Sequence, residues 1–296
     1  MTEQTDKPQQ PRFHDRGVPA VDHPPIDEIL ELERIEKNIY RGIAVESYLP
    51  RTFGGQVAGQ ALVAATRTAD EQYLVHSLHG YFIRPGNPKQ PIVYVVDRMR
   101  DGRSFCTRRV DAIQDGKTIF TMEASFHVPE DGGLRHQDQM PPAPLPEELP
   151  DYAELPAAER ETWMAEWSDW DIRPVPPEQT RTLPGLAAQQ RVWIRYRRKL
   201  PDVNILHVCA LAYLSDMTLL GSARVPHPGV EIQAASLDHA LWFLRPFRAD
   251  EWLLYDQTSP SAGFGRALTQ GRIYNRSGDM VAAVTQEGLT RIARDS

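Results

Sequence analysis

Residues 234–247 read AASLDHALWFLRPF, and the rest of the chain is best understood outward from this stretch. It begins as a strand, sets small polar residues among bulky apolar ones and stops at Pro246. Residues 75–85, VHSLHGYFIRP, echo it earlier in the chain. FIRP at 82–85 matches FLRP at 243–246, so the sequence offset between the two copies is 243 − 82 = 161. One echo could arise by chance, so the flanking sequence has to decide.

The flanking sequence supports a duplication. Residues 108–126 and 271–289 both read as a strand, a glycine-containing turn and another strand, which is typical of a hairpin. For the two turn glycines, Gly116 and Gly278, the offset is 278 − 116 = 162, which agrees with the first to within one position. We interpret the chain as two homologous halves of one fold.

Each half combines one helix that is apolar on most sides with a run of strands. The helices are predicted over 56–65 and 205–214, and such helices belong inside a fold. The strand-like runs lie near 33–46, 73–83, 91–99, 104–114, 117–128, 190–200, 230–244, 251–258, 264–275 and 279–291. This order predicts an α+β fold in which each half curls a sheet around a central helix. Two such units side by side would make one long sheet.

The chain divides into four predicted segments. They are a disordered tail over 1–26, an N-terminal unit over 27–129, a Pro-rich connector over 130–188 and a C-terminal unit over 189–296. The tryptophans of the connector have the spacing of one side of a short helix; they are Trp163, Trp167 and Trp170.

Composition excludes several classes of protein. A net charge of −7 over 296 residues argues against nucleic acid as the main partner. Two cysteines are too few for a disulfide framework or a cysteine-rich metal site. No apolar run approaches the ~20 residues of a membrane span, and no hydrophobic signal core opens the chain. The sequence also has no phosphate-binding glycine loop, metal cluster or serine-centred nucleophile elbow. We expect a cytoplasmic protein that needs no cofactor or metal.

Functional polar groups should stand where a duplicated fold otherwise needs apolar ones. At the offset of 162, Gln286 takes the place that Ala124 holds in the first half, on a core-facing strand position. At the offset of 161, Ser236 replaces Val75. Asp216 follows the second apolar helix, where a carboxylate is costly without a partner. Burying such an amide or hydroxyl without a hydrogen bond costs about 1–3 kcal/mol, so their presence at these positions indicates a functional role.

Together these three side chains could bind one water for general-base hydrolysis of an activated carbonyl. Asp216 would accept the proton while Ser236 and Gln286 orient the water. Each also has an ordinary structural interpretation: an amide satisfied by backbone, a strand serine and a helix-end carboxylate. Asp238 and His239 resemble an acid–base pair, but neighbours on a strand face opposite ways, so a direct dyad is not expected.

Motifs in both halves resemble a known family. They are FGGQVAGQA at 53–61, HS at 76–77, YFIRPG at 81–86, DGRSF at 101–105, DIRP at 171–174, LAYLSD at 211–216, SLDH at 236–239, WF at 242–243 and QEG at 286–288. On these residues the chain resembles acyl-CoA thioesterase II, the double-hotdog family, over about residues 28–292.

The resemblance implies two fused hotdog units and hydrolysis of fatty acyl-CoA to a free acid and CoA. The family's catalytic aspartate falls on Asp216, its hydroxyl residue on Ser236 and its glutamine on Gln286; they hold the attacking water without a covalent intermediate. It also implies a homodimer or a higher homo-oligomer. Some members end in a peroxisomal tripeptide, whereas this chain ends Arg-Asp-Ser at 294–296.

Two other functions stay open at this point. Hotdog folds also host enoyl-CoA hydratases, and fold alone does not set the reaction. That chemistry would use an Asp/His pair on one loop or helix, which Asp216 lacks nearby in sequence. The chain could also be a non-catalytic acyl-CoA-binding protein, although polar residues at all three positions argue against this. Candidates for binding CoA are exposed arginines such as Arg84 and Arg245.

Overall fold

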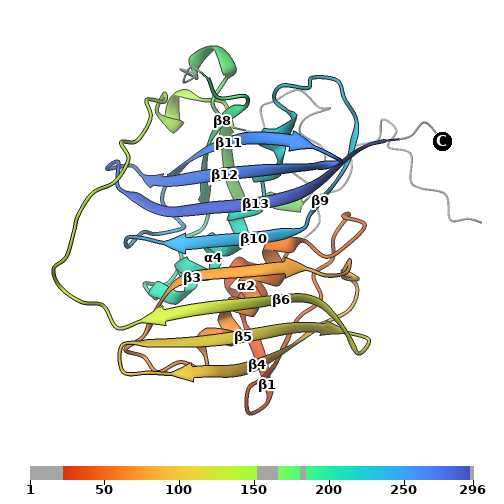
Figure 1. Ribbon diagram of the computed structural model, residues 1–296, viewed down its shortest axis with the longest axis vertical. Coiled ribbons are helices and arrows are strands. Elements are labelled where there is room, and N and C mark those ends of the chain that lie inside the picture. The colour runs from red at the N-terminus through yellow and green to blue at the C-terminus, as the bar shows by residue number, and fades with distance from the viewer. Residues whose placement is uncertain (1–22, 152–165, 181–184, 294–296) are drawn as a thin grey trace, which may run out of the picture.

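The structure is a computed structural model, which describes residues 23–151, 166–180 and 185–293. Within these residues thirteen antiparallel strands form one long, curved sheet, with the order β1-β2-β4-β5-β6-β3-β10-β13-β12-β11-β8-β7 and with β9 beside β13 (Figure 1). The strands of the first half are β1 (Leu32–Glu36), β2 (Ile39–Gly42), β3 (Leu74–Phe82), β4 (Ile92–Asp101), β5 (Phe105–Gln114) and β6 (Lys117–His127). Those of the second are β7 (Trp170–Pro174), β8 (Gln189–Tyr196), β9 (Ile232–Ser236), β10 (Asp238–Phe243), β11 (Leu253–Gly263), β12 (Arg266–Asn275) and β13 (Met280–Ile292).

The two halves join at the two strands that carry the repeated tetrapeptide. β3 and β10 pair antiparallel at the centre of the sheet, from Asp238 opposite Tyr81 to Trp242 opposite Ser77. On either side the order β3-β6-β5-β4-β2 is mirrored by β10-β13-β12-β11-β8. The prediction of one sheet from two repeated units is confirmed.

The register of the strands repeats as well as their order. Gly80 on β3 lies opposite Met122 on β6, and Leu241 on β10 lies opposite Val284 on β13. The differences in residue number, 241 − 80 = 161 and 284 − 122 = 162, are the two offsets of the repeat in the sequence. A position in one half can therefore be compared directly with its counterpart in the other.

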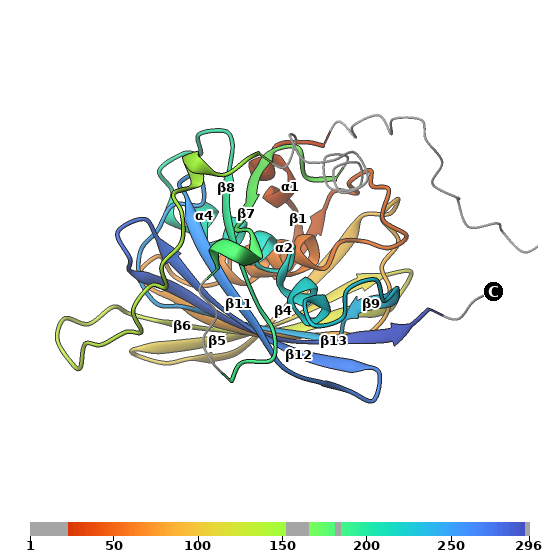
Figure 2. The same ribbon diagram turned by 90° about the horizontal axis from the view of Figure 1, so that it is seen from above.

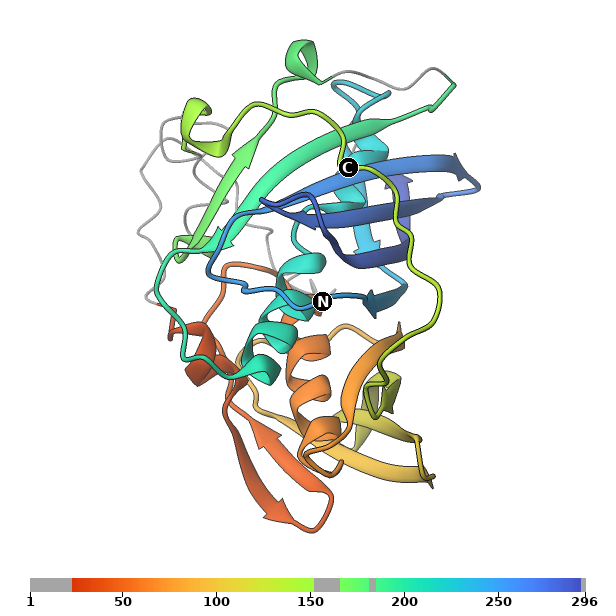
Figure 3. The same ribbon diagram turned by 90° about the vertical axis from the view of Figure 1, so that its left-hand side faces the viewer.

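The two predicted helices are α2 (Gly54–Thr66) and α4 (Asn204–Ser215), with a short α1 (Ile26–Leu30) at the start. They lie together on one side of the sheet (Figure 2) and side by side (Figure 3). Gly55 and Gly59 of α2 let the helices approach closely, since a Cβ at Gly55 would overlap the Tyr213 carbonyl oxygen and one at Gly59 would lie 3.2 Å from that of Cys209. Because each helix meets the sheet and the other helix, it is apolar all round. The described residues also form three 3₁₀ turns: η1 (Pro146–Glu148), η3 (Pro177–Gln179) and η4 (Leu219–Arg224).

The run predicted as one strand over 230–244 is two strands, because the ladder breaks at Leu237. The Leu237 N–H donates to Glu287 O at 2.9 Å, while the Glu287 N–H donates to Asp238 Oδ1 at 2.6 Å. A side chain thus replaces a backbone acceptor at this point. β9 therefore pairs with the end of β13, with Ser236 opposite Gly288, while β10 pairs with β3.

The connector differs from the helix that its tryptophans suggested. Trp170 begins β7, where its backbone pairs with β8 and its ring stacks on Tyr213 at 5.7 Å between centroids, so the helical prediction is wrong for this residue. Trp163 lies outside the described residues. The predicted tail also lies outside them up to residue 22, and Ile26 at its end begins α1.

One stretch, Asn204–Arg224, is long and apolar enough to cross a membrane by length and composition alone, which the sequence had not suggested. It comprises α4, a turn and η4, and most of it is buried within the fold. Its apolar character is that of a core helix, so it does not establish a membrane span.

Candidate active site

The structure brings the three predicted site residues together around one carboxylate oxygen. Asp216 caps the C-terminal end of α4, Ser236 ends β9 and Gln286 lies within β13. Oδ1 of Asp216 accepts hydrogen bonds from Ser236 Oγ at 2.9 Å and from Gln286 Nε2 at 2.6 Å. A carboxylate only accepts hydrogen bonds, so the Gln286 amide must present its nitrogen here.

Gln286 is fully buried, whereas Asp216 and Ser236 are partly buried. Its Oε1 atom is buried without a hydrogen-bond partner among the described residues. Such an acceptor is costly unless a ligand or water satisfies it, and this cost points to a site rather than to packing. The backbone is held independently, because Thr269 Oγ1 donates to Gln286 O at 3.0 Å.

The second oxygen of Asp216 faces the other half of the molecule. A Cβ at Gly54, the first residue of α2, would lie 2.5 Å from Oδ2 and 2.9 Å from Phe82 Cζ. Only glycine leaves room for the carboxylate at this helix start. Oδ2 therefore sits near backbone N–H groups at the positive end of the α2 dipole, although Asp216 itself belongs to the negative end of α4.

A cleft of about 190 Å³ opens at this point between the two halves. Gly54, Phe82 and Ser236 line it, together with the guanidinium-bearing side chains of Arg51 and Arg84. Arg51 also donates to Ala234 O, and Arg84 donates to Thr118 O at 2.7 Å. The cleft thus offers an anionic ligand two positive charges beside the candidate site.

Of the two arginines suggested by the sequence, only Arg84 lines this cleft. Arg245 instead donates to Met280 O at 2.8 Å and to His136 O at 3.3 Å, at the far end of β13 from Gln286. Arg51 was not singled out, because nothing in its local sequence sets it apart from other exposed arginines. Its position depends on a contact with β9, 183 residues away.

Strand alternation predicted that Asp238 and His239 would not form a dyad, and they do not. Asp238 accepts the Glu287 N–H, while His239 is buried with Nε2 2.8 Å from Ser215 Oγ. Ser215 Oγ already donates to Ala212 O at 2.9 Å, so His239 Nε2 must be the donor to it.

His239 thus fixes the residue immediately before Asp216. The Tyr255 hydroxyl holds the same residue by donating to the Ser215 carbonyl at 2.9 Å. Burial lowers the pKa of His239, and the charges of Asp216 and Asp238 offset part of this effect. The lowered pKa keeps the ring neutral near pH 7. Sequence alone missed this support, because Ser215 and His239 lie 24 residues apart.

The described residues of the first half contain no such set. Ala124 stands at the counterpart of Gln286, and opposite it on β5 is Arg108, at the counterpart of Thr269 (269 − 108 = 161). The Arg108 side chain is almost fully buried and donates to Thr68 Oγ1 at 2.9 Å and to Thr68 O at 3.0 Å. The first half therefore has a buried arginine beside Ala124 where the second half has Thr269 beside Gln286. Within residues 23–151, 166–180 and 185–293, no three His, Cys, Asp or Glu side chains converge as metal ligands would.

Comparison with known proteins adds a second line of evidence. A family model described as "Acyl-CoA thioesterase" matches residues 164–289, and another described as "Acyl-CoA thioesterase N-terminal domain" matches residues 46–127. The chain is 38% identical over 296 residues to Acyl-coenzyme A thioesterase 8 from Homo sapiens, covering 94% of this chain and 93% of that one.

Solved structures agree with the sequence comparison. Acyl-CoA thioesterase II TesB2 from Mycobacterium marinum is 56% identical with a TM-score of 0.81, covering 90% of this chain and 98% of that one. A protein of Alicyclobacillus acidocaldarius described as having a hot dog fold is 21% identical with a TM-score of 0.74, over 91% and 98% of the two chains, and bears on the fold alone. The predicted double hotdog fold is confirmed.

Proposed function

The chain belongs to the acyl-CoA thioesterase family and is a thioester hydrolase, and from this premise we propose that it hydrolyses fatty acyl-CoA with a water held by Asp216, Ser236 and Gln286. The observation that carries the proposal is the pair of hydrogen bonds from Ser236 and Gln286 to one oxygen of Asp216. They fix the carboxylate and leave Oδ2 as the proton acceptor.

The proposed reaction has one base and no covalent intermediate. Asp216 Oδ2 takes a proton from the water while the water oxygen forms a bond to the thioester carbonyl carbon. The tetrahedral intermediate then collapses, the C–S bond breaks, and the proton passes from Asp216 to the departing CoA sulfur. The products are a free acid and CoA, and the aspartate is restored.

Ser236 and Gln286 play a more specific part than orienting the water alone. Both donate to Asp216, so they hold its carboxylate in one rotamer and keep Oδ1 occupied. The unpartnered Oε1 of Gln286 remains free to accept the second proton of the water. His239 and Tyr255 act behind them by fixing Ser215, and they are positioning residues rather than catalytic ones.

The cleft lined by Arg51 and Arg84 suits the CoA end of the substrate. CoA carries phosphates, for which guanidinium groups are good partners. The cleft also contains Ser236, so a thioester bound there would present its carbonyl to the site. Fatty acid metabolism as the setting, a homo-oligomeric assembly and a cytoplasmic location remain predictions from the sequence.

The two competing functions are less well supported. A hydratase of this fold would need an Asp/His pair, but His239 is engaged with Ser215 and Asp238 with the Glu287 N–H. A binding protein would have no need of a carboxylate that two hydrogen bonds hold in one position.

One assay separates the three functions. The purified protein is mixed with palmitoyl-CoA and a thiol reagent, and in parallel with crotonyl-CoA, whose hydration removes its absorbance. We expect thiol release from palmitoyl-CoA and no loss of crotonyl-CoA absorbance in excess of its own hydrolysis. Binding of palmitoyl-CoA without thiol release would refute the proposed function.

A further inference from the structure

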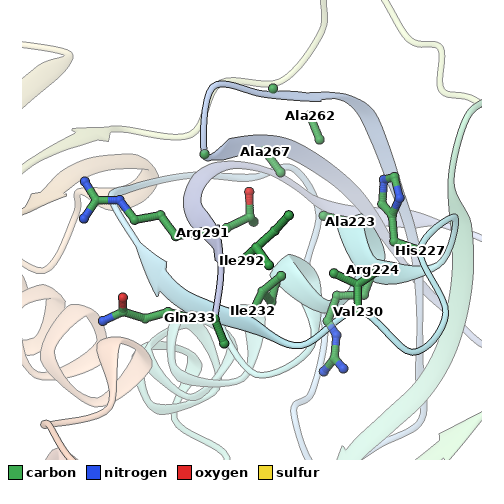
Figure 4. Close-up of a pocket in the computed structure, with 14 residues that line it drawn as sticks. Ala223, Arg224, His227, Val230, Ile232, Gln233, Ala262, Ala267, Arg291 and Ile292 are labelled. Carbon is green, nitrogen blue, oxygen red and sulfur yellow. The ribbon is translucent and has the colours of Figure 1, made fainter. Parts of the chain in front are cut away.

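A second and larger cavity lies in the C-terminal half, about 1000 Å³ in volume. Its walls are η4, β9, the β11–β12 hairpin and the end of β13. Ile232 and Ile292 lie at its centre in Figure 4, and Ala267 lies above them in the same view. Three basic side chains lie at its periphery in the same view: Arg224, His227 and Arg291. Its volume is that of a site for a whole small-molecule ligand, whereas the cleft at Ser236 is smaller than such sites are.

The cavity lies on the same face of the sheet as the catalytic groups. Side chains alternate along a strand, so Gln286, Gly288, Thr290 and Ile292 of β13 share one face. Directly opposite residues share a face too, and Gly288 stands opposite both Ser236 on β9 and Ala267 on β12. Thr290 and Ile292 line the cavity, so its floor continues the row that begins at Gln286.

The distances along this row match the length of a fatty acyl chain. Six residues separate Gln286 from Ile292, which is about 20 Å at ~3.3 Å per residue. An extended hydrocarbon advances roughly 1.3 Å per carbon, given a C–C bond of about 1.5 Å. About sixteen carbons would reach from the site to Ile292, whose side chain is 73% exposed at the far end. Six carbons, about 8 Å on the same bond length, would end near Gly288.

One side chain stands on the route between the site and the cavity. A Cβ at Gly288 would overlap Leu220 Cδ1, so the Leu220 side chain of η4 lies flat on the Gly288 backbone. Glycine is needed at this point for η4 to come so close to the sheet. Leu220 is an apolar, partly buried side chain, so another staggered rotamer that turned it off Gly288 would make it part of the wall.

A bound thioester must send its two ends in two directions from the carbonyl. The opening with two arginines beside Ser236 suits the anionic CoA end, and the larger apolar cavity suits the hydrocarbon. We propose that this cavity holds the distal part of a long acyl chain, beyond about the tenth carbon at ~1.3 Å per carbon, and that Leu220 divides it from the site. This inference rests on the proposed function and adds the class of acyl group that the site takes.

The test fills the cavity without touching the site. Thr290→Phe adds a ring to the floor, and Ala262→Trp adds one from an exposed position on the hairpin. The matched control is Leu268→Phe, which enlarges a partly exposed side chain on the opposite face from Ala267. For each protein, kcat/KM is measured with hexanoyl-CoA and with palmitoyl-CoA, after thermal unfolding has shown that it is folded.

We expect both filled variants to lose at least about tenfold in kcat/KM for palmitoyl-CoA, which is what burying two methylenes is worth. Their hexanoyl-CoA activity should stay within about twofold of the starting protein, because a six-carbon chain ends before the cavity. Both activities of Leu268→Phe should also stay within about twofold, because its side chain lies on the opposite face of the sheet. An unchanged palmitoyl-to-hexanoyl ratio in both filled variants would overturn the inference. The proposed function is judged separately, since its failure would appear as undiminished hydrolysis by Asp216→Asn.

A cross-linking experiment locates the chain end directly. The probe is a thioether analogue of palmitoyl-CoA with a diazirine at its last carbon, which cannot be hydrolysed. After irradiation, peptide mass mapping should place the adduct within residues 223–233 or 290–293, and Thr290→Phe should reduce it. An adduct in the Arg51 and Arg84 cleft would overturn the assignment by placing the tail at the other opening.

Discussion

Replacing Asp216 with asparagine removes the proposed base while keeping nearly all of its contacts. The asparagine Oδ1 can occupy the place of the aspartate Oδ1 and accept the same two hydrogen bonds, from Ser236 Oγ and Gln286 Nε2. Its amide nitrogen then stands where Oδ2 faces Gly54. The geometry survives, but the atom that takes the proton from water no longer can.

The expected size of the effect follows from this substitution. Loss of a general base lowers kcat by roughly 10²–10⁴-fold, or about 3–5 kcal/mol in the barrier. Stability should change much less, because two charge-assisted hydrogen bonds become neutral ones at about 1 kcal/mol each. Relief from holding a partly buried carboxylate offsets part of that loss.

The assay is thiol release from palmitoyl-CoA, measured for the Asp216→Asn protein beside a matched Asp238→Asn protein. Asp238 is a nearby carboxylate on β10 that accepts a hydrogen bond from the Glu287 N–H. Within the part of the chain that the structure describes, it forms no hydrogen bond with Asp216, Ser236 or Gln286. We expect the Asp238→Asn protein to keep most of its activity, because the asparagine oxygen can still accept the hydrogen bond from the Glu287 N–H. Near-normal turnover by a folded Asp216→Asn protein would remove Asp216 from the mechanism.

Two further predictions concern Ser236 and His239. Ser236→Thr should keep most of the activity because the hydroxyl donor to Asp216 remains, whereas Ser236→Ala should raise the barrier by roughly 1–3 kcal/mol for the lost hydrogen bond. Intact mass after quenching during turnover should show no acyl adduct, and an adduct on Ser236 would contradict water activation. Burial lowers the pKa of His239 below its unfolded value of about 6.5. As the pH drops through about 6.5, the unfolded chain therefore binds a proton that the folded chain does not. The free energy of unfolding should fall over this range. His239→Gln, whose amide can still donate to Ser215, should make that fall shallower in urea titrations at several pH values; identical slopes would refute this role.

Much of the architecture could be predicted from the sequence because the chain repeats itself. The matched tetrapeptides lie at the ends of β3 and β10, and the same two sequence offsets reappear in the register of the ladders. The two all-round apolar helices had to be internal, since no face could meet water. Gln286 was identified because its strand alternates and it stands where the first half has Ala124.

The sequence also predicted that Asp216, Ser236 and Gln286 belong together, but not how. They were expected to gather around a water, whereas Ser236 and Gln286 both donate to Asp216 itself. The break at Leu237, which turns one predicted strand into two, lets Ser236 face Gly288. It depends on hydrogen bonds with Glu287, which lies on a different strand far along the chain.

Local pattern determined the elements of this protein, and the tertiary structure decided the site that lies between them. A periodicity of two or 3.6 residues reports which face of an element is buried, and it is written into neighbouring residues. The contact of Asp216 with Gly54, the arginines of the cleft and Leu220 on Gly288 each join segments far apart in the chain. Their distances follow from strand register, helix approach and the break in a ladder, which no local pattern encodes.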